Sequence, residues 1–254
     1  MNLKPLKKTR LGVAIAATIA FSFSSFALAQ VESKASISQK FQQLVPFEVV
    51  EVNEHVSGLY EIVTATGIFY SSKDGKFLFS GSLHAFENGL PNLTEAKKRQ
   101  VASGVIAKLK NTLVTYKSPN EKHEVLVFFD STCGYCRKMH NDIRRYNAMG
   151  ITVHYALYPR SGLTDRQGNP IPGVAQLSSV ACSSNPQFAM NTLMQGGDVA
   201  PAQCESPVPM HYQLGQWLGV KGTPAVYDMG GNLVVPGYAP AERLLQSLEM
   251  RGQL

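Results

Sequence analysis

The chain has 254 residues and a formal net charge of +6, from 24 basic and 18 acidic residues. Four of the basic residues, Lys4, Lys7, Lys8 and Arg10, lie in the first ten positions, and without residues 1–29 the net charge falls to about +2. The basic balance therefore gives no support to nucleic-acid binding, and no basic cluster with interleaved aromatic residues appears elsewhere. The remaining length of about 225 residues is enough for two modest domains or one large one.

Residues 1–29 have the parts of a secretory signal peptide, namely a basic segment, an apolar core and small residues before a cleavage point. Ala27-Leu28-Ala29 predicts cleavage after Ala29. An uncleaved membrane anchor is the alternative, but serines interrupt the apolar run, which is shorter than the ~20 residues that a spanning helix needs. An exported chain with an even number of cysteines normally carries them as disulfides, and this chain has four.

Residues 46–86 contain short runs that alternate like β-strands: PFEVVEV, LYEIVTA, GIFYS and KFLFSGSL. Asp74-Gly75, between the last two runs, is typical of a two-residue hairpin turn. So small a sheet has little core of its own and commonly needs a partner surface. We therefore predict an α+β dimerisation domain with a small antiparallel sheet over residues 30–91. A monomeric appendage is the alternative.

Residues 92–117 are predicted to form a linker helix. Asn92 followed by Glu95 can cap the start of a helix. Four apolar residues then recur near helical spacing: Val101, Val105, Leu109 and Leu113. The basic residues beside this stripe indicate a solvated face rather than a docking patch. Lys117-Ser118-Pro119-Asn120 breaks the pattern and opens the next domain.

From residue 118 to residue 254 the pattern is that of an α/β domain. A buried strand, EVLVFFD, precedes a helix from Cys136 to Met149 that ends at Gly150, and the strand ITVHYALYP then shows alternating faces. A helical stretch over 174–220 is followed by two strands joined around Gly230-Gly231 and by a final helix, AERLLQSLEM. This order predicts a mostly parallel-crossover pattern with a helical insertion, closed by an antiparallel pair.

Cys133 and Cys136 lie where the buried strand ends and the helix begins. Unpaired N–H groups and the positive end of the helix dipole favour a thiolate there, so the pKa of Cys133 is expected below its ordinary value. Cys136 lies one turn later and deeper. Cys133 is therefore predicted to attack a disulfide and Cys136 to resolve the mixed disulfide. Gly134 allows a tight turn, and Tyr135 offers an aromatic surface at the rim.

Two other interpretations of the CxxC are disfavoured. A zinc site needs four ligands, and the chain has no second pair at matching spacing, so neither a metal nor another cofactor is expected. A structural bond between Cys133 and Cys136 would gain little, because the loop that it closes is so short. Cys182 and Cys204, which are 22 positions apart, suit a structural disulfide worth roughly 3 kcal/mol. A second redox pair is the alternative for them.

Gly222-Thr223-Pro224 leads into an apolar strand, roughly ninety residues after the CxxC. A proline cannot donate to the hydrogen-bond ladder, so it belongs at the start of that strand. A cis proline at this point would leave the preceding backbone free to pair with a bound peptide. From sequence alone, cis is the minority form of an X–Pro bond.

These features together resemble the thioredoxin superfamily, and nearly the whole chain after residue 29 resembles periplasmic disulfide isomerases of the DsbC type. The stretches that carry the resemblance include GIFYSSKDGK, YKSPNEKHEVLVFFDSTCGYCRKMH, YNAMGITVHYALYPRSGL, GVKGTPAV and LVVPGY. The resemblance implies a V-shaped homodimer whose thioredoxin-like domains face each other across an apolar cleft. It also implies roles for three pairs of residues: nucleophilic Cys133 and resolving Cys136, the second disulfide Cys182 and Cys204, and the cis-proline loop Thr223-Pro224.

Within this family, the DsbG type is the alternative. Gly134 and the second cysteine pair favour the DsbC type, because DsbG-like proteins typically carry proline at the first position between the cysteines. Thioredoxins place a buried acid six residues before the nucleophile, where this chain has Val127. Asp130 and Glu124 are then the candidate proton-transfer partners. His140 is predicted to be a packed or exposed histidine rather than a catalytic one.

The predicted function is that of a periplasmic disulfide isomerase and reductase, with chaperone activity, that acts on wrongly bonded exported proteins. A membrane thiol reductant of the DsbD type is the expected partner, because the dithiol must stay reduced. Three alternatives remain open: a net thiol oxidase, a DsbG-like reductase of single-cysteine sulfenates, and a dimeric holdase chaperone that binds unfolded chains without catalysis.

Overall fold

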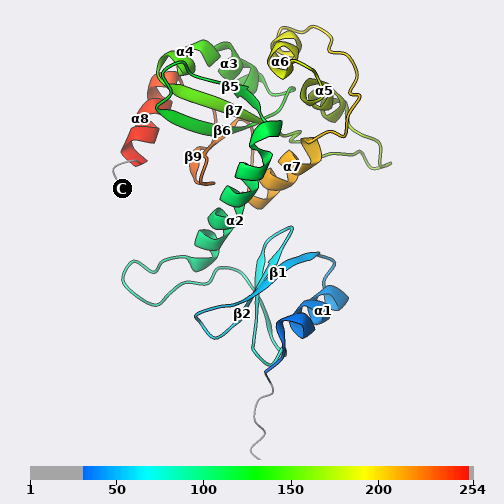
Figure 1. Cartoon of the computed structure of the whole chain (residues 1–254), viewed down its shortest axis with the longest axis vertical. Helices are drawn as coiled ribbons and strands as arrows, with labels where there is room; N and C mark the ends of the chain where they lie inside the picture. The colour runs from blue at the N-terminus through cyan, green and yellow to red at the C-terminus, as the bar shows by residue number, and fades with distance from the viewer. Residues whose placement is uncertain (1–30, 252–254) are drawn as a thin grey trace, which may run out of the picture. The chain divides into compact units, whose positions relative to one another are not determined.

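The computed structural model describes residues 31–251, so the predicted signal peptide and its cleavage after Ala29 lie outside the described residues. The described chain forms a four-stranded sheet with one helix, then a long helix, then a five-stranded sheet with helices on both faces (Figure 1). This confirms the predicted fold class. Between residues 31 and 251, no helix is both long enough and apolar enough to cross a membrane.

The N-terminal sheet is antiparallel throughout and its strands pair in chain order. Each strand overlaps one of the four predicted runs: β1 (Val49–Glu54), β2 (Tyr60–Thr64), β3 (Ile68–Ser71) and β4 (Leu78–Ser80). Helix α1 (Lys34–Leu44) packs on this sheet through Ile37 and Phe41. These two are the only buried residues of the helix, and so weak an apolar stripe explains why no helix is predicted there.

The turn between β3 and β4 forms at Asp74-Gly75, but it is longer than the predicted two-residue hairpin. The N–H of Ser72 donates to the carbonyl of Phe77 at 3.1 Å, which leaves four residues, 73–76, in the loop. Asp74 Oδ1 accepts hydrogen bonds from the hydroxyl of Ser72 at 2.6 Å and from the N–H of Lys76 at 3.2 Å. Gly75 adopts φ of +63°, a conformation that glycine takes without strain.

Helix α2 (Leu93–Leu109) begins at the predicted cap, because Asn92 Oδ1 accepts the N–H of Glu95 at 2.9 Å. The predicted stripe is confirmed only in part: Leu109 and Leu113 are buried, but Ala102 and Ile106 are buried in place of Val101 and Val105, which are partly buried. The reason is the close approach of Ala102 to the turn at Gly231. A Cβ added to Gly231 would lie 3.0 Å from the Cβ of Ala102. A larger residue would not fit at that contact.

The helix predicted over residues 92–117 ends early. After Leu109 the chain forms a 3₁₀ turn, Lys110–Thr112, and then strand β5 (Val114–Tyr116), which pairs antiparallel with β7. The residues just before Ser118 therefore belong to the second sheet. A strand of three residues is too short to show an alternating pattern against the preceding helical spacing.

The second sheet has the strand order β5-β7-β6-β8-β9. Its four further strands are β6 (His123–Phe129), β7 (Ile151–Leu157), β8 (Ala225–Asp228) and β9 (Leu233–Val235). In this sheet β6 and β7 run parallel, and β8 and β9 form the antiparallel pair, as predicted. The pairs β5–β7 and β6–β8 are also antiparallel, so parallel pairing is the minority. The side chains of β7 alternate between the two faces as predicted, with Val153, Tyr155 and Leu157 on one face and Ala156 on the other, and all residues of the strand are buried. Helices cover both faces of the sheet, which removes any solvated face.

Two cores lie on opposite faces of this sheet. The first core contains Val127, Phe129 and Tyr155, and the second contains Leu126 and Phe128 together with the buried stripe of α2. The remaining helices are α3 (Gly134–Asn141), α4 (Ile143–Ala148), α5 (Pro172–Ala181), α6 (Pro186–Met194), α7 (Val208–Trp217) and α8 (Ala241–Arg251). Helices α3, α4, α5, α6 and α8 contribute buried residues to the first core, and α7 contributes Val208 to the first core and Leu214 to the second.

Two of the predicted helices are divided in the structure. The helix predicted from Cys136 to Met149 breaks at Asp142, which separates α3 from α4. Gly150 ends α4 as predicted, with φ of +85° and the carbonyl of Asn120 only 2.9 Å from where a Cβ would lie. The predicted helical stretch 174–220 consists of α5, α6 and α7, and residues 195–207 between the last two are not helical. It forms the expected helical insertion between β7 and β8.

His211 on α7 fixes the 3₁₀ turn after α2 to strand β7. Its Nδ1 accepts the N–H of Leu157 at 3.2 Å, so the proton of the neutral ring is on Nε2, which donates to Thr112 Oγ1 at 2.9 Å. Thr112 Oγ1 in turn donates to the carbonyl of Leu109 at 2.7 Å. The side chain is completely buried, and this burial lowers the pKa of His211 to about 4.

A pH dependence of stability follows from His211. Its pKa is lower in the folded chain than in the unfolded one, so the unfolded state takes up the proton first as the pH falls. The stabilisation is complete above about pH 6.5 and is lost toward pH 4, by up to ~3 kcal/mol. We expect His211→Gln to flatten the free energy of unfolding over this range, measured by urea titration at several pH values.

His84→Gln is the matched control, because His84 is exposed. It should leave the pH profile as it is in the unmodified chain. If the free energy of unfolding changed with pH equally steeply in His211→Gln and in the unmodified chain, His211 would not be the cause of the pH dependence.

Candidate active site

The CxxC begins helix α3 at the end of β6, as predicted. Cys133 is the N-cap residue of α3, with extended backbone angles, and its N–H donates to the carbonyl of Asp130 at 3.2 Å. Strand β6 ends at Phe129, so only three residues separate the strand from Cys133. The sulfur therefore lies at the positive end of the helix, where the first N–H groups have no partner within the helix.

The structure brings Cys133 next to Thr223, which is 90 positions later in the chain. Cys133 Sγ lies 3.1 Å from the carbonyl oxygen of Thr223, to which the thiol donates. The peptide bond between Thr223 and Pro224 is cis, and β8 begins directly after it. The cis-proline loop that the resemblance implies is therefore present, and it contacts the first cysteine of the CxxC.

The two thiols have opposite acidities. Burial by itself raises the pKa of Cys133, but the polar groups of Thr223, Cys136 and Tyr135 around its sulfur outweigh burial and lower the pKa below its ordinary value. The Thr223 hydroxyl is buried and has no hydrogen-bond partner within residues 31–251, so it is free to donate to a thiolate. Burial raises the pKa of Cys136, which is completely buried.

The buried Cys136 sulfur receives one backbone hydrogen bond, from the N–H of Asp130 at 3.5 Å. Cys133 retains a 2% exposed fraction, whereas Cys136 has none. The predicted order of exposure is therefore confirmed. Such a pair can present one thiolate to a partner while the second thiol stays protonated beneath it.

Of the two residues between the cysteines, Tyr135 makes contacts that explain its position, whereas nothing in the structure requires glycine at position 134. Tyr135 is 63% exposed and stacks beside Tyr238, with 6.4 Å between the ring centroids. Lys138 Nζ lies 4.7 Å from the centroid of the Tyr238 ring, which adds a cation–π contact at this rim. Gly134 does not have a positive φ, and a Cβ there would meet no atom within 4 Å. A tight turn is thus no reason for glycine at that position.

The candidate proton-transfer partners lie in different places. Glu124 accepts hydrogen bonds from Lys110 at 2.7 Å and bonds His154 at 3.2 Å, and these contacts lower the pKa of Glu124. It lies near the start of β6, whereas the CxxC follows the end of that strand. Val127, at the position of the thioredoxin acid, is buried in the first core. Glu124 is therefore not part of this site.

Asp130 is part of the site, but its carboxylate is already engaged. Its Oδ1 accepts the N–H and the hydroxyl of Thr132, both at 2.7 Å, and its Oδ2 accepts the N–H of Arg160 at 3.0 Å. The Arg160 Nε lies 3.4 Å from the same oxygen. Asp130 thus ties the turn before Cys133 to the segment after β7. This is a positioning role, which sequence reasoning did not assign to it.

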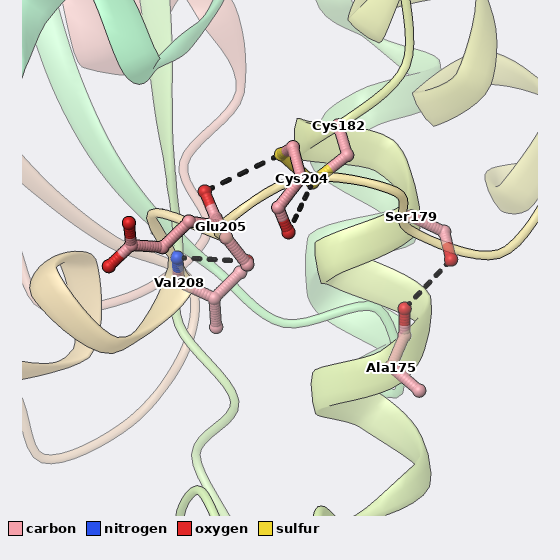
Figure 2. Close-up of a disulfide and its surroundings, with 7 residues drawn as sticks. Ala175, Ser179, Cys182, Cys204, Glu205 and Val208 are labelled. Carbon is pink, nitrogen blue, oxygen red and sulfur yellow. Dashed lines mark hydrogen bonds between the residues drawn. A yellow bond between two sulfur atoms is a disulfide. The ribbon is translucent and has the colours of Figure 1, made fainter.

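Cys182 and Cys204 form a disulfide with an S–S distance of 2.04 Å. The bond joins the C-terminal end of α5 to the segment before α7, as Figure 2 shows. Cys204 is exposed, and the carbonyls of Cys204 and Glu205 lie close to the two sulfurs. The bond closes a loop over residues 183–203, which contains α6 and the non-helical residues 195–203, and this supports the predicted structural role.

Removal of this disulfide is expected to lower stability and to leave the CxxC chemistry intact. Cys182→Ala/Cys204→Ala should lose roughly 3 kcal/mol of unfolding free energy, because the unfolded chain regains the entropy of the open loop. Chemical denaturation measures the loss, and the rate of Cys133 alkylation measures the CxxC. If the double variant folds but loses most of its disulfide-exchange activity, the alternative that Cys182 and Cys204 form a second redox pair would be favoured instead.

In the part of the chain that the structure describes, residues 31–251, no group of three or more His, Cys, Asp or Glu side chains is placed to hold a metal ion. Fold and site together define a thioredoxin-like thiol–disulfide exchange protein with an additional N-terminal domain. Residues 109–251 match the thioredoxin-like domain, and residues 25–95 match the N-terminal domain of the disulfide bond isomerase protein.

Three curated relatives are similar over most of their length. The chain is 35% identical over 235 residues to the thiol:disulfide interchange protein DsbC of Dickeya dadantii, which covers 91% of this chain and 94% of the relative. It is 34% identical to DsbC of Escherichia coli K12, over 91% and 93%, and 34% identical to DsbC of Haemophilus influenzae, over 86% and 91%. The chain therefore belongs to the DsbC family of thiol:disulfide interchange proteins. This confirms the resemblance found in the sequence.

Proposed function

We propose that this enzyme is a periplasmic disulfide isomerase and reductase that uses Cys133 and Cys136 on wrongly bonded exported proteins. The observation that carries the proposal is the opposite acidity of the two thiols beside Thr223. Hydrogen bonds lower the pKa of Cys133, while burial raises that of Cys136. This difference suits a pair in which one sulfur attacks and the other waits.

The first step is attack of the Cys133 thiolate on a substrate disulfide. A bond forms between Cys133 Sγ and one substrate sulfur, and the other substrate sulfur leaves as a thiolate with the electron pair. The mixed disulfide then has two fates. A second substrate thiolate attacks it and forms a new substrate pairing, which is isomerisation, or Cys136 attacks Cys133 Sγ and releases a reduced substrate. The second fate oxidises the CxxC, so a membrane thiol reductant of the DsbD type is the proposed partner.

Substitution of each cysteine should separate these steps. Cys133→Ser is expected to abolish both insulin reduction and the reactivation of scrambled ribonuclease, because no thiolate remains to form the mixed disulfide. Cys136→Ser, the matched control, should still form mixed disulfides with substrates and should accumulate them. Full residual activity in Cys133→Ser would disprove the assignment. A CxxC that is oxidised in growing cells would favour the oxidase alternative.

We also propose that the chain forms a homodimer through its N-terminal domain. Strand β4 is an edge strand of the described sheet, and its large apolar side chains are exposed: Leu78 and Phe79 by 49% each, with Phe77 beside them at 63%. An exposed apolar edge strand offers unpaired backbone groups and apolar surface to a second strand. A second copy of the same domain is the proposed partner of this edge.

Phe79→Lys in the full chain should weaken this dimer at least about tenfold, because it places a charge in an apolar contact. Sedimentation velocity across a concentration series measures the change. Phe188→Lys is the matched control, since Phe188 is an exposed aromatic residue on α6, at 68% exposure. Equal effects of the two substitutions, or a monomeric unmodified chain, would contradict the proposed interface.

A further inference from the structure

A hollow with a volume of about 400 Å³ lies beside the CxxC, and we refer to it as the Arg137 hollow. Four segments line it: the turn before Cys133 with Ser131, α3 with Arg137, α5 with Gln176, and the segment after α6 with Asp198. Its volume lies within the range of sites that bind small ligands. Ser131 and Arg137 flank the CxxC on either side in the sequence, so the hollow is a neighbour of the attacking sulfur.

Arg137 lies one helical turn from the attacking cysteine, because its N–H donates to the carbonyl of Cys133 at 3.1 Å. Its side chain is exposed, and no carboxylate of residues 31–251 lies within 4 Å of its guanidinium nitrogens. A guanidinium presents a planar fork of N–H donors that matches the two oxygens of a carboxylate. Arg137 is therefore a free anion-binding group beside the nucleophile.

Gln176 brings a second donor to the same hollow. The hydroxyl of Ser131, which is 5% exposed, donates to Gln176 Oε1 at 3.0 Å. This contact occupies the amide oxygen, so the NH₂ group of Gln176 remains available to a ligand. A guanidinium and an amide NH₂ group in one hollow can both donate to the same carboxylate.

The acidic side chains around the CxxC leave Arg137 free. Asp130 is buried, its carboxylate already accepts hydrogen bonds, and Arg160 Nε lies 3.4 Å from it. Asp142 follows the far end of α3, and a helix of eight residues is about 12 Å long, which exceeds the screening length of physiological salt. Asp198 lines the Arg137 hollow itself, but its carboxylate is more than 4 Å from the guanidinium. Asp198 is therefore a competitor for Arg137 rather than its partner.

Two further basic residues lie near Cys133. Lys138 is on α3, and Lys221 comes two residues before Thr223, whose carbonyl lies 3.1 Å from Cys133 Sγ. Both lysines are exposed, and in the described part of the chain neither has a carboxylate within 4 Å. Residues 118–254 carry ten basic and ten acidic residues, so the domain has no net charge that would attract anions. An attraction of anions to this site depends on the local placement of charges.

We propose that the Arg137 hollow binds a carboxylate of the substrate, so that Cys133 attacks disulfides with an acidic residue beside them faster than other disulfides. The inference rests on the proposed function, because it assumes that Cys133 attacks substrate disulfides. Arg137 and Gln176 donate to the carboxylate oxygens. Lys138 and Lys221 raise the local concentration of acidic chains. A chain held in this way keeps its disulfide within reach of the thiolate, and the subsite itself forms and breaks no covalent bond.

Three small disulfides test the proposal in the full chain: anionic glutathione disulfide, uncharged hydroxyethyl disulfide and cationic cystamine. The chain carries Cys136→Ser, so the reaction stops at the mixed disulfide with Cys133, which is measured by mass spectrometry of acid-quenched samples. Each second-order rate constant is divided by that of mercaptoethanol with the same disulfide, which removes the reactivity of the probe and the charge of the attacking thiolate. At an ionic strength of about 0.01 M, glutathione disulfide should react at least about tenfold faster than cystamine, and about 1 M salt should remove most of this preference.

Substitutions in the hollow should change the ratio of the normalised rate constant of glutathione disulfide to that of hydroxyethyl disulfide. Arg137→Gln should lower this ratio at least about fivefold, because it removes a charged donor, and Asp198→Asn should raise it. The same Cys133 thiolate attacks both probes, so a change in its reactivity cancels in the ratio. Lys122→Gln is the matched control, because Lys122 is exposed and precedes β6, whose seven residues place it roughly 23 Å from the end that leads to Cys133. It should leave the ratio unchanged.

Equal normalised rate constants for the three probes would overturn the subsite, and so would the same ratio in Arg137→Gln and Lys122→Gln. A peptide disulfide with glutamate beside its cysteine should react faster than the same peptide with glutamine, and equal rates for the two peptides would overturn the subsite as well. The lack of any mixed disulfide with Cys133, whatever the charge of the probe, would be a different failure. It would show that Cys133 does not attack, and so would refute the proposed function itself.

Discussion

The contact between Cys133 and Thr223 is the constraint on which the rest of the site depends. It follows from the strand order, because β8 lies antiparallel beside β6 and Phe128, near the end of β6, pairs with Ala225 at the start of β8. The residue before Pro224 must then lie next to the residues that follow β6. The long insertion of α5, α6 and α7 separates these segments in the chain without separating them in space.

This arrangement also explains why two thiols three residues apart behave differently. Cys133 follows the end of the central strand β6, beside Thr223 and the first turn of α3, whereas Cys136 is completely buried in the first core. The core beneath Cys136 is aromatic, with Tyr116, Phe129 and Tyr155 around His140. Low polarity around the Cys136 sulfur keeps this thiol protonated. In such surroundings the few polar atoms interact more strongly than they would in water.

The sequence predicted the fold class and the chemistry of the site because both are carried by local signals. The CxxC follows a continuous apolar run, and Thr223-Pro224 precedes another. Features that depend on tertiary contacts were not predictable. The buried stripe of α2 depends on how closely Ala102 approaches Gly231, and the Arg137 hollow depends on Gln176, which bonds Ser131 across 45 positions. Spacing along one helix contains no information about such partners.

The passage from α2 through a 3₁₀ turn into β5 has a consequence for how the chain can be divided. Ala102 and Ile106 complete the second core, and Val114–Tyr116 is an edge strand beside β7. A catalytic fragment cut at Ser118 would thus lack one strand and one side of its core, although every cysteine would be present. The smallest autonomous catalytic unit begins inside the long helix, so that helix is a shared structural part rather than a detachable spacer.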